Sequence, residues 1–532
     1  MAVAQLVRDA ETVVAYAIAH SLVDPRDARW AYNAVLDAVG AAGPGPDALA
    51  SGRDREPRCA EDALAMLGGD ARAEVLEAPL ERLAQVAVDN GREEDTPSGR
   101  DRVQTEVMGR LTPRPSEVAR RFAEDYRRGP AEATDGFYRM SCDVRYVRKV
   151  AIARNVAWTS PTDWGDLEIT INLSKPEKDP KAIAAAGSAP AGEAYPACQL
   201  CLENEGYYGR GAGDANGAHP ARQNLRIVPI ELGGEPWGLQ YSPYAYFEEH
   251  CIAMSASHRP MHVDRQNMGR LLDFVDLLPH YFVGSNADLP IVGGSILSHD
   301  HFQGGRHVFP MMRAEVLDER PMAAWPEVSL GVVRWPLSTL RLRSADRGAL
   351  LDAADHVLAA WRDWTDESVG VVAHDGDVAH NTVTPVARRE ADGSYVLYLA
   401  LRCNVTSEQN PLGDFHPHAQ WHHIKKENIG LIEVMGLAIL PPRLVDELGR
   451  VEELLVEGGG DLAQRLADDP LTSSHAQWAL ELSERGPVDA EGAHRLVRDG
   501  VGEVFQHVLE DAGVFKWDEA GRAAQQRFVD SL

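Results

Sequence analysis

The sequence predicts an α+β protein in which a central block of strands and helices lies between two helical regions. Near the start, residues 6–17 place apolar side chains at helical spacing. Residues 167–173 instead alternate apolar and polar side chains, which is typical of a half-buried strand. Helical spacing returns after Pro441 and continues toward the end.

The N-terminal region is expected to be helical up to about residue 128. A looser helical pattern at Trp30, Leu36 and Val39 follows the first helix. Two polar stretches rich in Gly and Pro, at 43–57 and 89–101, interrupt the pattern. No cluster of candidate catalytic or metal-binding residues is visible here, so we expect a packed helical accessory region.

Short strands and one helix are expected along the central block. The predicted strands are 167–173, 224–230, 250–254 and 394–401, and the predicted helix is 264–278. Residues 174–181 form a loop with three lysines, which either meets phosphates or is simply exposed. Residues 182–197 are rich in Ala, Gly and Pro and are expected to be a linker.

Composition and charge exclude several classes of protein. The chain has 532 residues, of which 44% are hydrophobic and 25% charged, so a disordered or collagen-like chain is not expected. A net charge of -28 disfavours nucleic acid and anionic membranes as partners. No run of 18 apolar residues and no secretory signal are visible, and the six cysteines are sparse. These features predict a reduced, cytoplasmic protein.

The segment 288–305 carries the clearest chemistry. His299, His301 and Gln303 follow one another with single residues between them. On an extended strand all three side chains would point to one side. A neutral imidazole is a good nucleophile toward phosphorus near pH 7, and an amide donates to a phosphoryl oxygen. We therefore expect His301, His299 and Gln303 to be catalytic residues.

Small residues before the histidines are expected to bind the substrate. Gly293 and Gly294 allow close approach of the backbone to a ligand, and their N–H groups are candidate donors. Ser295 and Ser298 offer hydroxyl donors in the same segment.

A second pattern of the same form occurs later in the chain. His416, His418 and Gln420 repeat the order His-x-His-x-Gln, at a distance of 416 − 299 = 117 residues. This separation is about one small domain. One short shared pattern is weak evidence for duplication by itself.

Several stretches together resemble the second class of galactose-1-phosphate uridylyltransferases, found in many Gram-positive bacteria. Their order and combination make the resemblance specific, although no single stretch does. They are residues 172–180, 198–205, 288–305, 380–385 and 415–436.

The resemblance implies a fold and a reaction. The first class of these enzymes has two related histidine-triad half-domains, so we expect two histidine-triad-like half-domains of antiparallel sheets with helices. The implied regions are 1–130 (helical), 131–325 (first half-domain), 326–440 (second half-domain) and 441–532 (helical). UDP-glucose and galactose 1-phosphate would exchange to glucose 1-phosphate and UDP-galactose through a uridylyl-histidine, as in the Leloir pathway of galactose metabolism.

The resemblance also implies roles for single residues. The nucleophile of the first class is the second His of His-Pro-His-x-Gln, which matches His301, with Asp300 in place of the Pro. A structural zinc would be held by Cys198, Cys201, His258 and His299, although a metal-free Cys pair stays open. Substrate contacts are expected from His416, His418, Gln420, Lys425 and Lys426. A second metal at the later cluster, or an ordinary solvated lysine pair, also remains open.

Two alternatives to the transferase remain. The first is a histidine-triad hydrolase or phosphorylase of nucleoside polyphosphates, in which water or phosphate takes the second step. The second is a zinc-stabilised scaffold without enzymatic activity. The expected partners are UDP-glucose and galactose 1-phosphate, with no nucleic acid or membrane and with a homodimer as one outcome. The sequence does not fix the hexose, the nucleotide or the oligomeric state.

Overall fold

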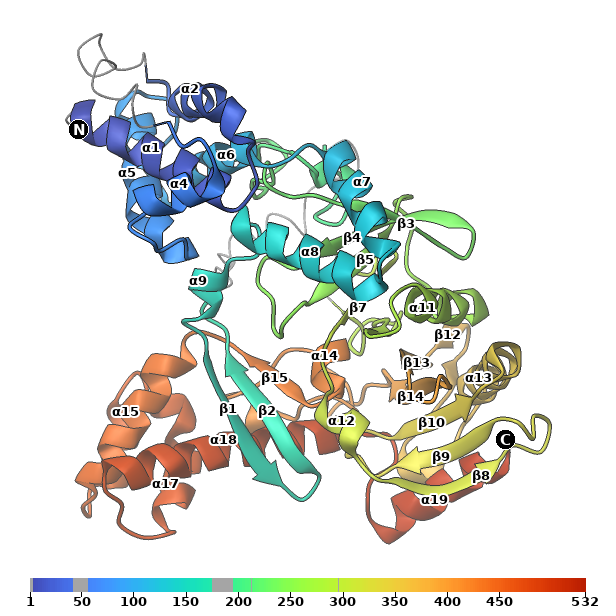
Figure 1. Cartoon of the computed structure of the whole chain (residues 1–532). Helices are drawn as coiled ribbons and strands as arrows, with labels where there is room; N and C mark the ends of the chain where they lie inside the picture. The colour runs from blue at the N-terminus through green and yellow to red at the C-terminus, as the bar shows by residue number, and fades with distance from the viewer. Residues whose placement is uncertain (1–2, 42–55, 175–194, 212, 295) are drawn as a thin grey trace. The chain divides into compact units, whose positions relative to one another are not determined.

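The computed structural model describes residues 3–41, 56–174, 195–211, 213–294 and 296–532 (Figure 1). The chain forms two compact units and passes between them several times. The first unit comprises Met1–Arg154, Ser174–Ala245 and Glu249–His258, and the second comprises Asn155–Leu173, Tyr246–Glu248 and Arg259–Leu532.

Helices make up the first part of the first unit. Each has local causes: Thr96, for example, caps α6 by accepting a 3.0 Å hydrogen bond from Gly99 N, and Pro97 occupies the first turn. The helices are α1 (Val3–Ala19), η1 (Pro25–Asp27), α2 (Ala28–Ala38), α4 (Ala60–Met66), η2 (Ala73–Leu76), α5 (Glu77–Asp89), α6 (Pro97–Leu111), α7 (Pro115–Tyr126), α8 (Pro130–Asp143) and α9 (Lys149–Ile152), followed later by η3 (Leu202–Asn204).

Three antiparallel strands complete the first unit. They are β3 (Val228–Leu232), β4 (Glu235–Tyr241) and β5 (Cys251–Ser255), with β4 in the middle. Tyr241 is buried on β4 and donates a 3.0 Å hydrogen bond to Thr134 O of α8. This bond joins the strands to the helical part of the same unit.

A twisted sheet in the second unit carries the central motif. Its strand order is β7-β6-β13-β14-β10-β9-β8, and every neighbouring pair is antiparallel. The strands are β6 (Phe282–Gly284), β7 (His301–Gly305), β8 (Val316–Pro321), β9 (Ser329–Val333), β10 (Thr339–Ser344), β13 (Asn381–Arg389) and β14 (Tyr395–Cys403).

Two smaller sheets belong to the same unit. In the first, β2 (Gly165–Ile171) pairs antiparallel with β1 (Val156–Thr162) and parallel with β15 (Leu437–Leu440). The second is the short ladder of β11 (His374–Asp375) and β12 (Val378–Ala379).

The helices of the second unit follow from similar local causes. Asp264 caps α11 (Arg265–Leu277) by accepting a hydrogen bond from Asn267 N at 2.7 Å. The other helices are α12 (Pro310–Arg313), α13 (Arg347–Arg362), η4 (Glu367–Val369), η5 (Ala419–Trp421), α14 (Leu431–Val434), α15 (Leu444–Glu457), α16 (Leu462–Asp468), η6 (Ser473–His475), α17 (Ala476–Ser483), α18 (Ala490–Ala512) and α19 (Glu519–Asp530).

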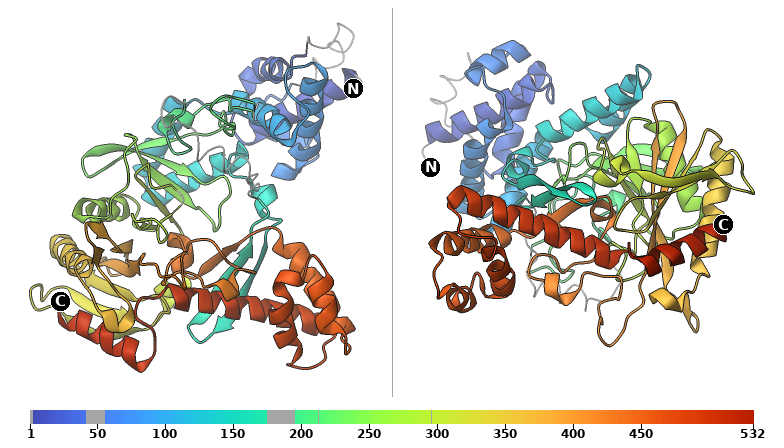
Figure 2. Two further views of the ribbon diagram at one scale, coloured as in Figure 1. Left: turned by 180° about the vertical axis from the view of Figure 1, so that it is seen from behind. Right: turned by 90° about the horizontal axis from the view of Figure 1, so that it is seen from below.

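The long helix α18 packs across β1 and shares a core with the sheets (Figure 2). A Cβ atom at Gly502 would lie 2.3 Å from Ser160 Cβ, so only glycine allows this close approach. Trp335 is fully buried in the same core and donates to Val434 O at 2.9 Å. The C-terminal helices therefore contribute to the core of the second unit.

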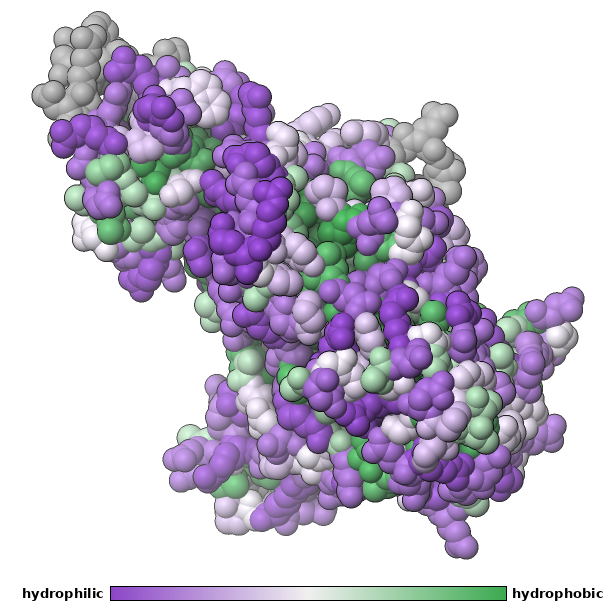
Figure 3. Space-filling model, turned by 45° about the vertical axis from the view of Figure 1, so that its right-hand side comes forward, coloured by the Kyte–Doolittle hydropathy of each residue, from purple (hydrophilic) through white to green (hydrophobic). Residues whose placement is uncertain are grey.

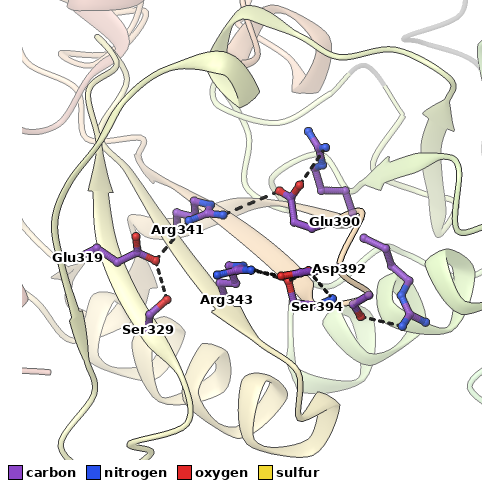
Figure 4. Close-up of polar contacts among 10 residues, drawn as sticks. Glu319, Ser329, Arg341, Arg343, Glu390, Asp392 and Ser394 are labelled. Atoms are coloured by element: carbon purple, nitrogen blue, oxygen red, sulfur yellow. Dashed lines mark hydrogen bonds and ion pairs between the residues drawn. The ribbon is translucent and has the colours of Figure 1, made fainter.

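Charged side chains cross one face of the large sheet in Figure 4. Arg341 on β10 lies 3.4 Å from Glu319 on β8 and 3.8 Å from Glu390 at the start of the β13–β14 turn. Arg343 on the same strand pairs with Asp392 in the β13–β14 turn. Each such pair adds little stability alone, but together they favour one register.

Hydrophilic residues cover much of the face in Figure 3, in keeping with the net charge of -28. Across the described residues, none of the helices combines the length and apolar character needed to span a membrane.

The predicted α+β class is confirmed, with antiparallel sheets and helical regions toward both ends. The strand predicted at 224–230 begins only at Val228, because residue 224 lies in a turn and residues 225–227 form no regular structure. The looser helical pattern that includes Trp30 corresponds to α2, where the Trp30 side chain is 59% exposed. Helical structure extends to Ile152, and the predicted boundaries at 130, 325 and 440 stay predictions. The predicted linker at 182–197 lies mostly outside the described residues.

Candidate active site

The first His-x-His-x-Gln motif lies where a bend enters β7. His301 opens the strand, and Gln303 pairs with Gly284 of β6 two residues later. Alternation along β7 therefore places His301 and Gln303 on one side of the strand. His299 precedes the strand in a bend, so the expectation of one continuous extended segment is wrong for His299. The bend instead places the His299 carbonyl beside the His301 ring.

The His301 ring is held in one protonation state. Its Nδ1 lies 2.7 Å from the His299 carbonyl oxygen, which can only accept, so Nδ1 carries the proton and donates. Nε2 then carries the lone pair. Burial lowers the pKa of His301 to about 4, against the smaller raising effect of that hydrogen bond. The ring is therefore neutral at pH 7 and is suited to nucleophilic attack through Nε2.

Asp300, between the two histidines, faces two guanidinium groups. Its Oδ2 lies 3.4 Å from Arg259 Nε and 3.8 Å from Arg270 Nη1, and its N–H donates to Arg259 O at 2.8 Å. The side chain is buried, and burial raises its pKa despite the two arginines. Asp300 is therefore held both by its backbone N–H, which bonds to Arg259, and by its carboxylate, which lies beside the two arginines.

The glycines before the motif are explained by packing. A Cβ at Gly293 would lie 2.6 Å from two backbone carbonyls, and one at Gly294 would lie 2.5 Å from Asn286 Nδ2. Ser298 is exposed, and Ser295 lies outside the described residues. The structure thus accounts for both glycines without a ligand, and their predicted role in substrate binding stays a prediction.

Three of the predicted metal ligands form a cluster in the first unit. Cys198 Sγ and Cys201 Sγ are 3.5 Å apart, and Cys201 Sγ lies 3.1 Å from His258 Nδ1. These spacings resemble the edges of a tetrahedron with Zn–S bonds of about 2.3 Å. Burial, followed by the charge of Cys198, raises the pKa of Cys201 to about 12, and a bound cation would favour the thiolate instead. The donor set therefore fits zinc.

The fourth predicted ligand, His299, belongs to the second unit and is fully buried there. Its role as a ligand stays a prediction.

The second His-x-His-x-Gln motif enters η5 rather than a strand. His416 is buried, with Nε2 3.1 Å from Asn428 Oδ1. His418 Nδ1 lies 3.2 Å from Asp511 Oδ1 of α18, and its Nε2 donates to Asp414 O at 3.2 Å. Gln420 is exposed. This motif is thus held against α18.

The two predicted lysines have different surroundings. Lys425 is buried, with Nζ 2.7 Å from Glu433 Oε1 and 3.2 Å from Glu427 Oε2. The alternative that Lys425 and Lys426 are both ordinary solvated lysines is therefore wrong for Lys425. Lys426 is exposed. The predicted three-lysine loop lies outside the described residues after Ser174.

Sequence reasoning missed two charged groups near these residues. Asp511 lies 93 residues after His418, and no local pattern connects them. Arg402 is buried on β14 and donates to Ile429 O at 3.0 Å. A charged residue within an otherwise apolar strand is a signal that points to Arg402.

Two family models match the chain. The model for the N-terminal domain of galactose-1-phosphate uridyl transferase covers residues 63–260, and the model for its C-terminal domain covers residues 274–480. Together they span more than half of the chain and include both His-x-His-x-Gln motifs.

Relatives are similar over nearly the whole chain. A galactose-1-phosphate uridylyltransferase of Bacillus subtilis is 46% identical over 529 residues, covering 99% of this chain and 98% of that protein. One from Streptococcus pneumoniae is 51% identical over 441 residues, covering 82% and 86%. The crystal structure of yeast Ap4A phosphorylase Apa2 is 11% identical, with a TM-score of 0.29 and coverages of 57% and 89%, a similarity too low to carry an argument. On the family models and these relatives, the chain belongs to the galactose-1-phosphate uridyl transferase family.

Proposed function

We propose that the protein transfers a uridylyl group from UDP-glucose to galactose 1-phosphate, giving glucose 1-phosphate and UDP-galactose. The observation that carries the proposal is the neutral His301 ring, whose Nδ1–H donates a hydrogen bond to the His299 carbonyl oxygen. Family membership supports the choice of substrates, since the relatives are named for this activity.

In the first half-reaction, the lone pair on His301 Nε2 attacks the uridylyl phosphorus of UDP-glucose. A bond forms between Nε2 and phosphorus, and the bond from phosphorus to the bridging oxygen breaks. Glucose 1-phosphate leaves with that electron pair. Positive charge develops on the imidazole ring during the attack. The hydrogen bond from Nδ1 to the His299 carbonyl oxygen stabilises this charge.

In the second half-reaction, a phosphate oxygen of galactose 1-phosphate attacks the same phosphorus. The bond to Nε2 breaks, UDP-galactose leaves, and the ring returns to its neutral form. Direct attack of galactose 1-phosphate on UDP-glucose would bring two anionic substrates together. The covalent intermediate divides this transfer into two separate displacements. The nucleotide stays bound throughout, so its binding energy serves both halves.

Fixed donors are needed for the phosphoryl oxygens. Gln303 lies on the same side of β7 as His301, which supports its amide as one such donor. Ser295, Ser298 and the N–H groups of Gly293 and Gly294 are proposed as further donors. His299 is proposed to act by positioning, through its carbonyl.

The hexose phosphate is proposed to meet the second motif and the lysines that follow it. His416, His418, Gln420 and Lys426 are the proposed contacts, together with Lys425. The burial of Lys425 beside two carboxylates supports a role in ordering this segment. Each of these assignments can be tested by an effect on KM for galactose 1-phosphate.

A zinc ion is proposed to hold the loops of the motif together. Cys198, Cys201 and His258 supply three ligands, and His299 is the proposed fourth. Such a closed tetrahedral site would supply structure rather than chemistry. Metal analysis of purified protein, with Cys198→Ser as the comparison, tests this part, and the expected result is one zinc in the wild type and none in the variant.

The wider setting is also a proposal. The protein would act in the Leloir pathway of galactose metabolism in the cytoplasm, and its association into a homodimer stays a prediction. Sedimentation of the purified protein distinguishes one copy from two.

Intact-protein mass spectrometry after incubation with UDP-glucose alone tests the reaction. The expected result is a gain of one uridylyl group on wild type and none on His301→Asn. Adding galactose 1-phosphate should remove the group and produce UDP-galactose. UMP release without an adduct would favour the hydrolase alternative, and no adduct with no turnover would contradict the proposal.

A further inference from the structure

We propose that a cavity in the first unit binds the phosphate group of a small metabolite. The cavity has a volume of about 200 Å³. Its walls come from the start of α5, one side of α6, the end of α8 and the segment 145–154. None of its lining residues is among the predicted catalytic, substrate or metal residues, so the proposal does not depend on the transfer reaction.

Positive charge gathers in this cavity. Four of its described lining residues are cations that come from ten consecutive positions: Arg145, Arg148, Lys149 and Arg154. Its described carboxylates are Glu77 and Asp101. The formal net charge of these lining residues is +2, whereas the whole chain has a net charge of -28. A positive recess on such an acidic protein attracts small anions selectively.

The two carboxylates hold the arginines in fixed positions. Arg148 makes a two-point contact with Asp101, at 2.6 Å from Nη1 to Oδ1 and 2.9 Å from Nη2 to Oδ2. Arg145 Nη2 lies 2.5 Å from Glu77 Oε1, and Arg154 Nη2 lies 3.8 Å from Glu77 Oε2. Guanidinium groups that are already ordered lose less side-chain entropy when an anion binds.

The backbone turns sharply at Arg145 to present this segment. Arg145 has a φ of 59°, in the left-handed region, which costs on the order of 1 kcal/mol for a residue with a side chain. Its N–H donates to Cys142 O at 2.8 Å, and its Nη1 donates to Ala73 O at 3.2 Å. Arg145 follows the end of α8 at this turn and lines the cavity.

The cavity has both a charged wall and an apolar one. Thr105 and Met108 of α6 are buried in its lining, and Val147, Val150 and Ala151 add apolar surface. This combination fits a phosphate on a small organic body better than a bare hydrated ion. Arginine and lysine are the side chains best suited to the phosphate oxygens.

Calorimetric titration of the full-length protein tests the proposal with two probes, inorganic phosphate and glycerol 2-phosphate. The test variant is Lys149→Gln with Arg154→Gln, since Arg154 is 68% exposed and its contact with Glu77 is loose. The control is Arg26→Gln with Arg120→Gln, which removes the same charge from exposed positions in the same unit. Phosphate bound at the catalytic centre would be equal in both variants, so the difference isolates the cavity.

We expect a binding component that is at least tenfold weaker in the test variant and unchanged in the control. Tighter binding of glycerol 2-phosphate than of inorganic phosphate would support a phosphate ester as the ligand, whereas binding of inorganic phosphate without the ester would contradict the ester and identify free phosphate. Equal affinity in wild type and test variant would overturn the proposal, as would equal weakening in the control. Crystals soaked in tungstate give a check independent of the variants: an anomalous peak in the cavity supports the site, and its absence there overturns it.

Discussion

The two His-x-His-x-Gln motifs of the second unit have the same pattern but different surroundings. In the first, His301 begins a strand and its Nδ1 donates to a carbonyl two residues earlier, which leaves the Nε2 lone pair for chemistry. In the second, His418 leads into a 3-10 helix, and both of its ring nitrogens contact oxygens of Asp511 and Asp414.

The residue between the histidines explains part of this difference. Asp300 in the first motif is held by two arginines, whereas the second motif has Pro417, which fixes φ and lacks an N–H donor. The same spacing of histidines therefore yields a neutral, buried imidazole, the proposed nucleophile, in one place and a contact to α18 in the other. Pattern alone does not assign chemistry, and the partners of each ring nitrogen do.

Replacing His301 with Asn breaks the comparison most severely. We expect the turnover number to fall at least about 10⁴-fold, because the proposed nucleophile is removed while the amide preserves the shape of the site. Steady-state kinetics measures the loss, and circular dichroism checks the fold. The matched variant His418→Asn should keep most of the activity, and a full turnover number in His301→Asn would move the nucleophile elsewhere.

The low pKa of His301 predicts a pH effect on stability. The folded-state pKa of about 4 lies below the ordinary 6.5, so the unfolded chain binds more protons between these values. The free energy of unfolding therefore falls as pH drops from 6.5 to 4, by about 3 kcal/mol through this group. Urea unfolding at pH 7 and pH 5 measures it. His301→Asn should lack this component, and an identical pH dependence in both proteins would contradict the assignment.

Asp300→Asn sharpens the role of the residue between the histidines. The substitution keeps the size of the side chain but removes the Asp300 negative charge beside Arg259 and Arg270, at an expected cost of about 2 kcal/mol in stability and roughly tenfold in turnover. Thermal unfolding and kinetics measure both effects. Asp530→Asn removes an exposed carboxylate partner of Arg320 and is the control, expected to be near neutral. Wild-type behaviour of Asp300→Asn would show that the arginines do not hold the motif.

His418→Asn has the smallest expected effect. Loss of the contact with Asp511 should destabilise the second unit by about 1 kcal/mol, with turnover changed only a few-fold. Urea unfolding compared with Asp511→Asn measures it, since two variants that break one contact should cost similar amounts. A loss of turnover as large as in His301→Asn would mean that both motifs carry chemistry.

The sequence predicts the local parts of this molecule well. The alternation at 167–173 corresponds to β2, and the helix predicted at 264–278 corresponds to α11. The pairing of Cys198 with Cys201 is local too, and His301 and Gln303 lie on one strand as expected.

What the sequence does not predict depends on distant contacts. His299 lies in a bend because the chain must turn before pairing with β6, which no local pattern encodes. Asp511 lies beside His418 because α18 packs against other elements of the second unit, β1 and η5 among them. From the sequence, Lys425 has the character of a surface lysine. In the structure it is buried and paired with Glu433, which is distant enough that the local sequence does not predict the contact.

The parallel pairing of β2 with β15 has a consequence for the time course of synthesis. Leu437 is made 266 residues after Ile171 (437 − 171), which takes on the order of 13–50 s at about 5–20 residues per second. During this interval the hydrophobic residues Ile169 and Ile171 lie beside a strand edge whose partner does not yet exist. A chain stopped before residue 437 is therefore expected to be prone to aggregation.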